Sequence, residues 1–428
     1  MSLRKEGYKS RIIDKVIENK LNTFGAVCIE GPKWCGKTWA SLNHSNSVVF
    51  LGDPTNNYQN KRLAETSTHL VLNGDMPRLI DEWQEVPEIW DAVRHKVDES
   101  IGVGKFILTG SSTPTHKGIL HSGTGRIARI RMRPMTLYES GDSSGTVSLN
   151  DLFENKEFAF LTSDVSLEKI IDIIVRGGWP NSINKSRKQT LDITKEYINS
   201  IIEEDFTRVD GIKRNKVKVA YLLRSLARNE STMASNSTLR KDITENEDDS
   251  VDIDTIADYL DVFERLFLID NQPAFNPNFR SSIRVARSPK RHLVDPSLAI
   301  AALDLSHEKL LDDLDTLGLM FESLVVRDLR IYGETNGGKI YHYRNFNTNK
   351  ELDAVIEYPD GRWGGFEIKL GFNKVDEAAK NLIDIANYME SQDKSKKPAF
   401  LCVICGLTTA AYKREDGVYV IPITALKH

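Results

Sequence analysis

A glycine-bounded loop carries the clearest chemical signal in the sequence. Residues 31–38 read Gly-Pro-Lys-Trp-Cys-Gly-Lys-Thr and fit the phosphate-loop pattern G-x-x-x-x-G-K-[ST]. Glycines let backbone N–H groups curl around phosphate oxygens, and the helix after the loop adds positive potential at its N-terminus. Lys37 is expected to contact the β- and γ-phosphates of ATP, and the Thr38 hydroxyl to ligate Mg²⁺. The other predicted nucleotide contacts in this stretch are Gly31, Pro32, Lys33, Trp34, Cys35, Gly36 and Trp39.

An acidic pair follows a second apolar strand pattern, where Leu79-Ile80 leads into Asp81 and Glu82. We expect Asp81 to contact the nucleotide's Mg²⁺ by holding its hydration shell. Glu82 is expected to polarise a water for in-line attack on the γ-phosphate. Because a kinase needs no water-activating carboxylate at this place, the pair favours hydrolysis over transfer of the phosphate.

Two more residues are predicted to contact the γ-phosphate. The strand 105–109 ends in hydroxyl side chains, among which we prefer Thr109 as the group that senses this phosphate, with Ser111 almost as suitable. Arg126 follows a flexible glycine-containing stretch and is a candidate contact, either within the chain or from a neighbouring subunit. A plain turn and a surface arginine are the alternatives. For Trp34 and Cys35, packing and contact with the adenine side both stay open.

A second set of chemically suited residues lies near the C-terminus. Two strand patterns are joined by the turn Pro359-Asp-Gly361. Alternation along a strand puts Glu367 and Lys369 on one face, and a turn centred near Gly361 brings Asp353 opposite Lys369 within a residue or two. We expect Asp353 and Glu367 to bind a second Mg²⁺ or Mn²⁺ while Lys369 positions or deprotonates a water. The alternative is a salt-bridge cluster without catalytic function.

The spacing of apolar segments predicts the elements that position these residues. Strands at 26–30, 47–51, 78–81 and 105–109 alternate with helical stretches, which is typical of a parallel sheet covered on both faces. Residues from about 150 to 270 have a helical pattern, including 193–206 and 218–228. The last part is predicted as helix 317–332, strands 339–345, 351–358 and 364–370, helix 374–390, and strands 399–405 and 418–423. This α/β chain is divided into predicted domains at 1–145, 146–310 and 311–428.

Composition limits the classes of function and location. A chain of 428 residues and 48.4 kDa favours two or three domains. Its 57 Lys and Arg against 61 Asp and Glu give a net charge of −4, which excludes a bulk-basic protein but allows a local basic groove. Four cysteines indicate a reducing compartment. The sequence shows neither a signal-peptide pattern nor an apolar run long enough to span a bilayer, so we predict a cytoplasmic protein without a membrane partner.

The motifs follow the order of a known family. The chain resembles the prokaryotic AAA-type ATPases that carry a C-terminal domain of unknown function. The resemblance rests on Asp53-Pro54, Ile80-Asp-Glu-Trp-Gln-Glu-Val-Pro87, Phe106-Ile-Leu-Thr-Gly-Ser-Ser112 and Gly125-Arg126, and continues through Gly177-Gly-Trp-Pro180, Ser288-Pro-Lys290, Val294-Asp295 and Phe321-Glu322. Gly52 departs from the family, which tends to have an acidic residue there. The resemblance implies an AAA-type ATPase core and a helical, winged-helix-like middle.

The C-terminal pattern is similar to restriction-endonuclease-like nucleases. Its order of helix, three strands, helix and strand matches that fold, and Asp353 with Glu367-x-Lys369 matches the D…E-x-K site. In some members of that group the first helix adds a metal ligand, a position that corresponds to Glu322. The resemblance thus implies a nuclease-like C-terminal domain.

The implied winged-helix-like module covers short helices at 239–243 and 253–263 and an apolar strand at 266–269. Residues 242–254 contain seven acidic side chains and no basic one, which would repel phosphates, so we interpret this region as an interaction or packing module. Two basic clusters lie elsewhere and would form either solvated faces or a surface that follows a nucleic-acid backbone. They comprise Lys213, Arg214, Lys216, Lys218, Arg280, Arg284, Arg287, Lys290 and Arg291.

We therefore predict an AAA-type ATPase that binds and hydrolyses ATP and is coupled to a nuclease-like domain acting on, or sensing, DNA or another nucleic acid. The alternative is a nucleotide-dependent switch whose nuclease-like domain is a non-catalytic binding module. The oligomeric state stays open. A GTPase is disfavoured because the N-K-x-D match at 373–376 lies far from the loop. Cys402 and Cys405 should point to opposite faces of a strand, which excludes a shared zinc site.

Overall fold

The computed structural model describes residues 3–99, 102–113, 119–244, 251–278, 280–345, 348–393 and 397–428. The chain folds into two compact units. The first contains Met1–Pro134, Glu203–Arg214 and Asp261–Leu268, and the second contains Met135–Ile202, Asn215–Leu260 and Ile269–His428. The first unit therefore includes two segments from the middle of the sequence.

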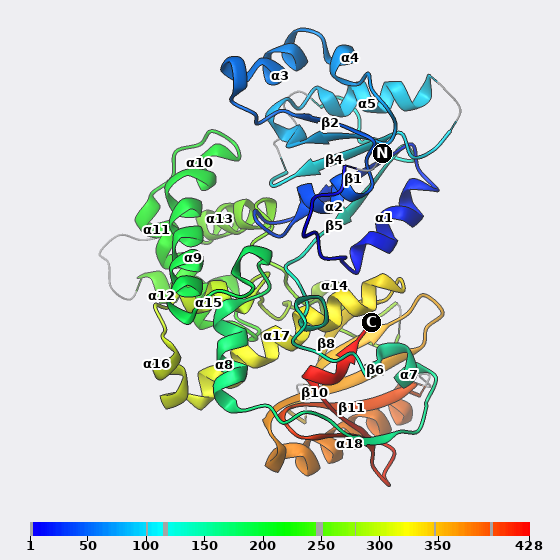
Figure 1. The fold of residues 1–428 in the computed structure, drawn as a ribbon. Coiled ribbons are helices and arrows are strands. Elements are labelled where there is room, and N and C mark those ends of the chain that lie inside the picture. The colour runs from blue at the N-terminus through cyan, green and yellow to red at the C-terminus, as the bar shows by residue number, and fades with distance from the viewer. Residues whose placement is uncertain are drawn as a thin grey trace. The chain divides into compact units, whose positions relative to one another are not determined.

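Five parallel strands form the sheet of the first unit, in the order β2-β3-β4-β1-β5 (Figure 1). Every residue of β1 and β4 is buried, as expected for central strands of a parallel sheet. The predicted parallel α/β sheet is confirmed, and β5 is a strand that the sequence pattern did not reveal. The strands are β1 (Ala26–Glu30), β2 (Ser47–Phe50), β3 (Arg78–Asp81), β4 (Phe106–Gly110) and β5 (Ile127–Arg131).

Short helices connect these strands. The core on one side of the sheet includes Trp83 and Trp90, whose ring centroids lie 4.9 Å apart, packed with Leu108 and Ile80. Burial of these large rings stabilises the turn that follows β3. The connecting helices are α2 (Lys37–Asn43), α3 (Thr55–Thr66), α4 (Thr68–Val71), the 3₁₀ turn η1 (Trp83–Glu85) and α5 (Ile89–Asp98), while α1 (Ile13–Leu21) precedes the sheet and α10 (Phe206–Arg208) comes from the middle of the sequence.

The second unit contains a seven-stranded mixed sheet in the order β7-β12-β13-β11-β10-β9-β8. Strand β9 is antiparallel to both β8 and β10, whereas β11 runs parallel to both β10 and β13. The strands are β7 (Ala159–Leu161), β8 (Lys339–Asn345), β9 (Lys350–Glu357), β10 (Trp363–Gly371), β11 (Phe400–Leu407), β12 (Ala410–Lys413) and β13 (Tyr419–Pro422); β6 (Val147–Ser148) pairs with β14 (Leu426–Lys427).

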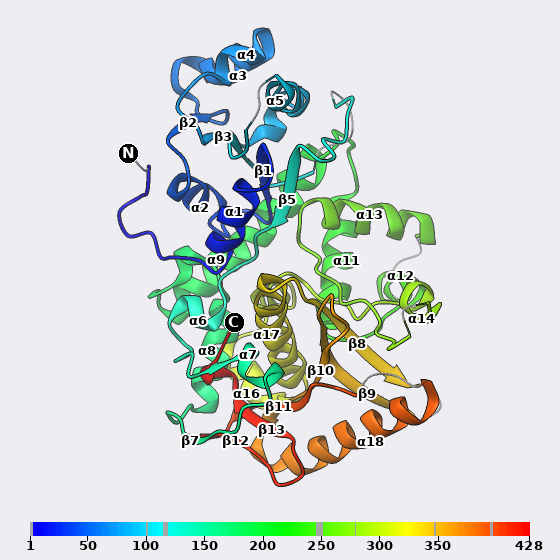
Figure 2. The ribbon, with the colours of Figure 1, turned by 90° about the vertical axis from the view of Figure 1, so that its right-hand side faces the viewer.

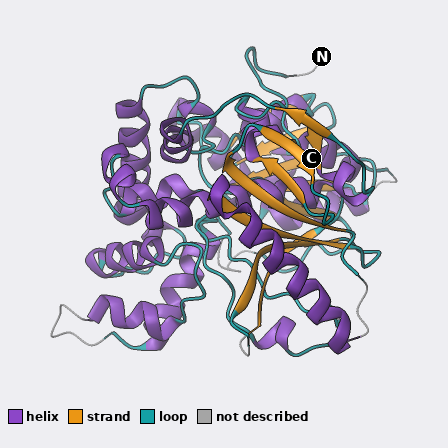
Figure 3. Cartoon of the chain, turned by 90° about the horizontal axis from the view of Figure 1, so that it is seen from below, coloured by secondary structure: helices purple, strands orange, loops and turns teal. Residues whose placement is uncertain are grey.

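Two long helices cover the two faces of this sheet. Leu382 of α18 (Val375–Asp393) shares a core with Val355, while the neighbouring Ile356 faces Gly333 of α17 (Leu314–Thr335). Since adjacent residues of a strand point to opposite faces, α17 and α18 lie on opposite sides. Figure 2 shows α18 in orange along the sheet, and Figure 3 shows the strands in orange beside the purple helices. The helix and strand order predicted for residues 317–423 is confirmed, with β12 added.

The remaining helices of the chain lie mainly between the two sheets in sequence. They are α6 (Leu137–Ser140), α7 (Leu149–Phe153), α8 (Leu167–Arg176), η2 (Pro180–Ser182), α9 (Arg187–Ser200), η3 (Ile201–Asp205), α11 (Lys216–Arg228), α12 (Asn236–Thr244), α13 (Ile253–Arg265), α14 (Ile283–Ala286), α15 (Pro296–Ala302) and α16 (His307–Asp312), with η4 (Phe372–Lys374) and η5 (Ile423–Ala425) near the C-terminus. Among the described residues, no helix is long and apolar enough to cross a membrane.

Of two expectations for the middle of the chain, one is confirmed and one is wrong. Residues 193–206 are helical throughout, as expected, although the α-helix α9 changes to the π-helical turn η3 after Ser200 and α10 begins at Phe206. The strand expected over 266–269 is a turn, because Phe267 has a φ of 59°, outside the extended region. Only Ile269 of that segment pairs as an isolated bridge, with Leu293. Residues 245–250, which carry part of the acidic stretch, lie outside the described residues.

Candidate functional site

The phosphate loop connects β1 to α2, as predicted. Its glycines are required by geometry: a Cβ on Gly31 would lie 2.1 Å from the Met132 carbonyl oxygen, and Gly36 has a φ of 103°. Arg11 stabilises the loop, since its Nη1 donates to the Cys35 carbonyl oxygen over 2.8 Å. Cys35 is buried, which favours packing for its side chain, whereas Trp34 and Trp39 are exposed.

Lys37 is the first residue of α2, and its side chain contacts the backbone of this loop. Its buried ammonium donates to the carbonyl oxygens of Gly31 and Pro32 over 2.9 and 2.8 Å. Both of these acceptors are neutral carbonyl oxygens, so neither contact neutralises the charge of the ammonium. Phosphate oxygens would therefore be stronger acceptors than its present ones.

Asp81 is the centre of the site, at the C-terminal end of β3. One of its oxygens, Oδ1, accepts hydrogen bonds from Thr38 Oγ1 over 2.9 Å and from Thr109 Oγ1 over 2.7 Å. Burial raises the pKa of Asp81 and the charge of Glu82 adds to the rise, while both hydroxyl contacts oppose it. The hydroxyl of Thr38 beside this carboxylate is an oxygen-ligand set of the kind that Mg²⁺ prefers.

Glu82 is held by a second layer of polar side chains. Ser111 donates from Oγ to Glu82 Oε2 over 2.9 Å, and Gln84 Nε2 donates to the same oxygen. The Glu82 backbone N–H donates to Thr109 Oγ1 over 3.0 Å, and its φ of 59° lies in the left-handed region. Such strained backbone is typical of functional positions.

The strand order explains this convergence. Because β4 lies between β1 and β3, the end of β4 brings both of its hydroxyl residues to the acidic pair. Sequence reasoning treated Thr109 and Ser111 as alternatives, but Thr109 contacts Asp81 and Ser111 contacts Glu82. Gln84 was not identified; its place two residues after a candidate water-activating carboxylate was the available signal.

Arg126 precedes β5, at the end of the sheet where the parallel strands begin, whereas the phosphate loop lies where they end. Strands β1 and β5 are parallel, and Ile127 is paired with Ala26 at the start of β1, whereas the phosphate loop follows the end of β1. Arg126 Nε contacts Asp98 Oδ1 over 2.9 Å. The contact with a γ-phosphate bound in the same chain is thus not supported, because the strand length separates them. The contact across a subunit boundary stays a prediction.

The predicted C-terminal residues also come together, within the second unit. Lys369 Nζ lies 2.5 Å from Glu367 Oε2 and 3.5 Å from Asp353 Oδ2, and the Ile368 backbone N–H donates to Asp353 Oδ2 over 2.8 Å. Asn381 of α18 donates to the other oxygen of Glu367 over 2.5 Å. The antiparallel register of β9 and β10 positions these groups.

A second lysine enters this cluster. Lys290 Nζ lies 2.5 Å from Glu322 Oε1 and 3.6 Å from Asp353 Oδ1. Burial raises the pKa of Glu322 and of Glu367 to about 8, whereas the charges of Lys369 and Lys290 outweigh burial and lower the pKa of Asp353. Within the described ranges, no group of three or more His, Cys, Asp or Glu side chains is arranged to hold a metal ion.

The assignment of Lys290 to a basic surface cluster is wrong. Its side chain is buried between the carboxylates of Glu322 and Asp353, and its backbone pairs with the buried Gln272 in an antiparallel bridge. Arg291 is buried as well, and Arg284 forms a bidentate salt bridge with Glu357. The basic run at 280–291 is therefore mainly internal pairing rather than a solvated face.

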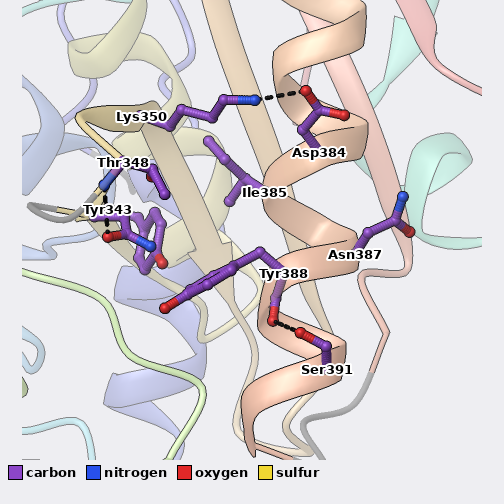
Figure 4. A pocket seen from close by; sticks show the side chains of 9 residues that line it. Tyr343, Thr348, Lys350, Asp384, Ile385, Asn387, Tyr388 and Ser391 are labelled. Carbon is purple, nitrogen blue, oxygen red and sulfur yellow. Dashed lines mark hydrogen bonds and ion pairs between the residues drawn. The ribbon is translucent and has the colours of Figure 1, made fainter.

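A pocket of about 420 Å³ lies between α18 and strands β8 and β9 of the same unit. Figure 4 shows Asp384 and Tyr388 projecting from α18 toward Lys350 and Tyr343, and the Lys350 and Asp384 side chains are paired over 2.5 Å. Its lining residues are Tyr343, Asn345, Thr348, Lys350, Asp384, Ile385, Asn387, Tyr388 and Ser391. Cys402 and Cys405 are free and buried.

Three family models match successive parts of the chain. Residues 23–140 match a model described as an AAA domain, residues 167–309 match a domain of unknown function (DUF8612), and residues 317–426 match another domain of unknown function (DUF4143). The first match covers the phosphate loop, Asp81, Glu82 and Thr109. The part of the chain that contains the phosphate loop and the acidic pair is therefore similar to AAA domains.

Relatives extend over most of the chain. The uncharacterized protein Rv2008c of Mycobacterium tuberculosis and the uncharacterized protein Mb2031c of Mycobacterium bovis are each 24% identical over 357 residues, which is 82% of this chain and 72% of theirs. Among solved structures, the Walker-type ATPase PABY2304 of Pyrococcus abyssi aligns with 70% of this chain and 97% of its own, at 14% identity and a TM-score of 0.46.

Proposed function

We propose that the first unit binds ATP with Mg²⁺ and hydrolyses it. The observation that carries this proposal is the shared Asp81 oxygen, which accepts from Thr38 of the phosphate loop and from Thr109 of β4. This arrangement joins a phosphate-binding element, a metal-binding carboxylate and a polar strand end at one edge of the sheet. The match of residues 23–140 to an AAA domain supports the same class.

Each residue has a defined part in the proposed reaction. Lys37 exchanges its two carbonyl acceptors for the β- and γ-phosphates. Thr38 and Asp81 would hold Mg²⁺, directly and through water, and the ion supplies charge neutralisation at the phosphate oxygens. Glu82 accepts the proton of the attacking water while Ser111 and Gln84 keep its carboxylate oriented. Thr109 couples the position of Asp81 to that of the Glu82 backbone.

The direct test is release of phosphate from ATP by the full chain, with and without Mg²⁺, and with and without added DNA or RNA. We expect Mg²⁺-dependent hydrolysis. Absence of phosphate release under all of these conditions, together with absence of ATP binding, would contradict the proposal.

For the second unit we propose a restriction-endonuclease-like fold with a metal-dependent phosphodiesterase site, in which Asp353 and Glu367 bind Mg²⁺ or Mn²⁺ and Lys369 acts on the water. The convergence of these residues on adjacent antiparallel strands supports it. In the alternative, the two lysines neutralise the carboxylates permanently, and the unit is a non-catalytic binding module of a nucleotide-dependent switch. The contacts of Lys290 with Glu322 and Asp353 favour this alternative.

We also propose that the chain is divided into three domains at residues 145 and 310, with a winged-helix-like middle domain, and that the protein acts on or senses nucleic acid. A cytoplasmic location agrees with the low number of cysteines. If Arg126 acts on the γ-phosphate, it does so from a neighbouring subunit, which requires an oligomer.

A further inference from the structure

The phosphate loop contains a second lysine, and its partner comes from a distant segment. Lys33 Nζ lies 2.5 Å from Oδ1 of Asp205, within the first unit. The Asp205 side chain is only 5% exposed, and its other oxygen, Oδ2, is buried and has no hydrogen-bond partner among the described residues. Lys33 is therefore the contact that stabilises a buried carboxylate with one unsatisfied oxygen.

Asp205 belongs to a segment, Glu203–Arg214, that also contacts the turn after the acidic pair. Arg208 Nη2 lies 2.6 Å from Glu85 Oε1, and Glu85 is three residues beyond Glu82. Phe206 is buried with its ring centroid 4.9 Å from that of Phe263. The segment is thus attached to both sides of the nucleotide site, at the phosphate loop and at the turn η1.

The position of Lys33 in the loop places it near the proposed phosphates. It directly follows Pro32, whose carbonyl oxygen accepts from the Lys37 ammonium. Since the backbone of this loop would wrap the β- and γ-phosphates, a side chain as long as lysine reaches the same region from its third position. A terminal phosphate and the Asp205 carboxylate are both anions that would attract this one cation.

We propose that Asp205 and the terminal phosphate of ATP compete for Lys33, so that the segment Glu203–Arg214 responds to the nucleotide bound in the loop. This inference rests on the proposed ATP binding and adds a nucleotide-sensing function to it. When Lys33 turns to the phosphate, Asp205 is left as a buried carboxylate without a partner. Such a group is strongly unfavourable, so the segment moves to hydrate it. ADP lacks the γ-phosphate and leaves the ion pair in place.

The test is a double-mutant cycle on nucleotide affinity. Fluorescent, non-hydrolysable ATP and the matching ADP are titrated, with Mg²⁺, into the full-length wild type, Asp205→Asn, Lys33→Met and the double variant. We expect Asp205→Asn to bind the ATP analogue about fivefold more tightly, which is ~1 kcal/mol, with ADP affinity unchanged. Lys33→Met should bind the ATP analogue more weakly, and adding Asp205→Asn to it should have no further effect.

Arg208→Gln is the matched control, because it removes the other attachment of the same segment without touching Lys33. It should leave the ratio of ATP to ADP affinity unchanged; an equal gain in this variant would overturn the inference. Hydrogen exchange of residues 203–214 in the wild type provides a test that needs no variant. We expect faster exchange with the ATP analogue than with ADP, and equal rates would overturn the inference.

The outcomes separate this inference from the proposed function. If the wild type binds no nucleotide, both are wrong. If it binds the ATP analogue but Asp205→Asn gains no affinity, or gains the same in the Lys33→Met background, only the competition for Lys33 is wrong. A merely structural ion pair would lower stability in Asp205→Asn without changing the preference for ATP over ADP.

Discussion

Thr109 donates its hydroxyl hydrogen bond to Asp81 over 2.7 Å, although the two residues are 28 positions apart in the sequence. The contact exists because β4, which ends at Thr109-Gly110, lies between the strand of the phosphate loop and the strand of Asp81. The same hydroxyl accepts from the Glu82 backbone N–H. One side chain thus links Asp81, the carboxylate proposed to hold Mg²⁺, to Glu82, the residue proposed to activate water.

The proposed water activation predicts different effects for two substitutions. Glu82→Gln should retain ATP binding and lose hydrolysis by about 10²-fold or more, because general-base catalysis contributes about 10²–10⁴-fold. Lys37→Ala should lose binding itself, since its ammonium contacts the ground-state phosphates. Phosphate release and nucleotide titration measure the two effects. Glu88→Gln, an exposed carboxylate of the same region, is the control. Equal turnover in wild type and Glu82→Gln would remove Glu82 from the mechanism.

Thr109→Val should slow hydrolysis with little change in ATP affinity. Valine keeps the shape of threonine, but it leaves Asp81 and the Glu82 N–H with one partner fewer, a cost of about 1–3 kcal/mol for a buried group. Ser111→Ala should slow hydrolysis as well, through the Glu82 carboxylate alone. Single-turnover kinetics and thermal unfolding check both variants. Full activity in Thr109→Val would show that the Thr109 hydroxyl is not needed for hydrolysis and that the side chain only packs.

Arg126→Ala should lower hydrolysis and spare binding if the arginine acts across a subunit boundary. Mixing it with Lys37→Ala should then restore activity, because each variant supplies what the other lacks. Arg94→Ala is the matched control, since Arg94 also contacts Asp98. Unchanged hydrolysis in Arg126→Ala would return the residue to the surface.

The raised pKa of Glu367 predicts a specific dependence of stability on pH. Burial, followed by the charge of Asp353, raises this pKa from 4.5 to about 8. Between these values the folded state binds more protons than the unfolded state, so the contribution of Glu367 to stability falls as pH rises through this window. Glu367→Gln should therefore gain stability relative to wild type between pH 5 and pH 8. Urea unfolding of both proteins across this range measures it; a constant difference would contradict the raised pKa.

Calorimetric titration of Mn²⁺ decides between the two proposals for the second unit. If Asp353 and Glu367 form a metal site, Lys290→Met should bind Mn²⁺ more tightly than wild type, because a competing cation is removed, and Glu367→Ala should bind it more weakly. Nuclease activity should follow the same order. The absence of Mn²⁺ binding in wild type and Lys290→Met would eliminate the phosphodiesterase and leave the binding module.

The sequence alone was sufficient for every feature whose chemistry is local. The loop at 31–38 and the pair Asp81-Glu82 are runs of neighbouring residues, so their type and order define what they can bind. The parallel sheet of the first unit and the helix and strand order of residues 317–423 could also be predicted from the sequence, because the spacing of apolar residues indicates which face of each element is buried.

Only the tertiary structure decided which distant residues meet. The order of the strands brings Thr109 into contact with Asp81 and Ser111 into contact with Glu82. The register of β5 places Arg126 at the N-terminal ends of the strands, away from the phosphate loop. An isolated bridge buried Lys290 among carboxylates, and a chain segment 172 residues away supplied Asp205 to Lys33. Such contacts depend on the order of the strands in a sheet and on which later segments of the chain pack into the first unit. The local periodicity of apolar residues carries no information about either.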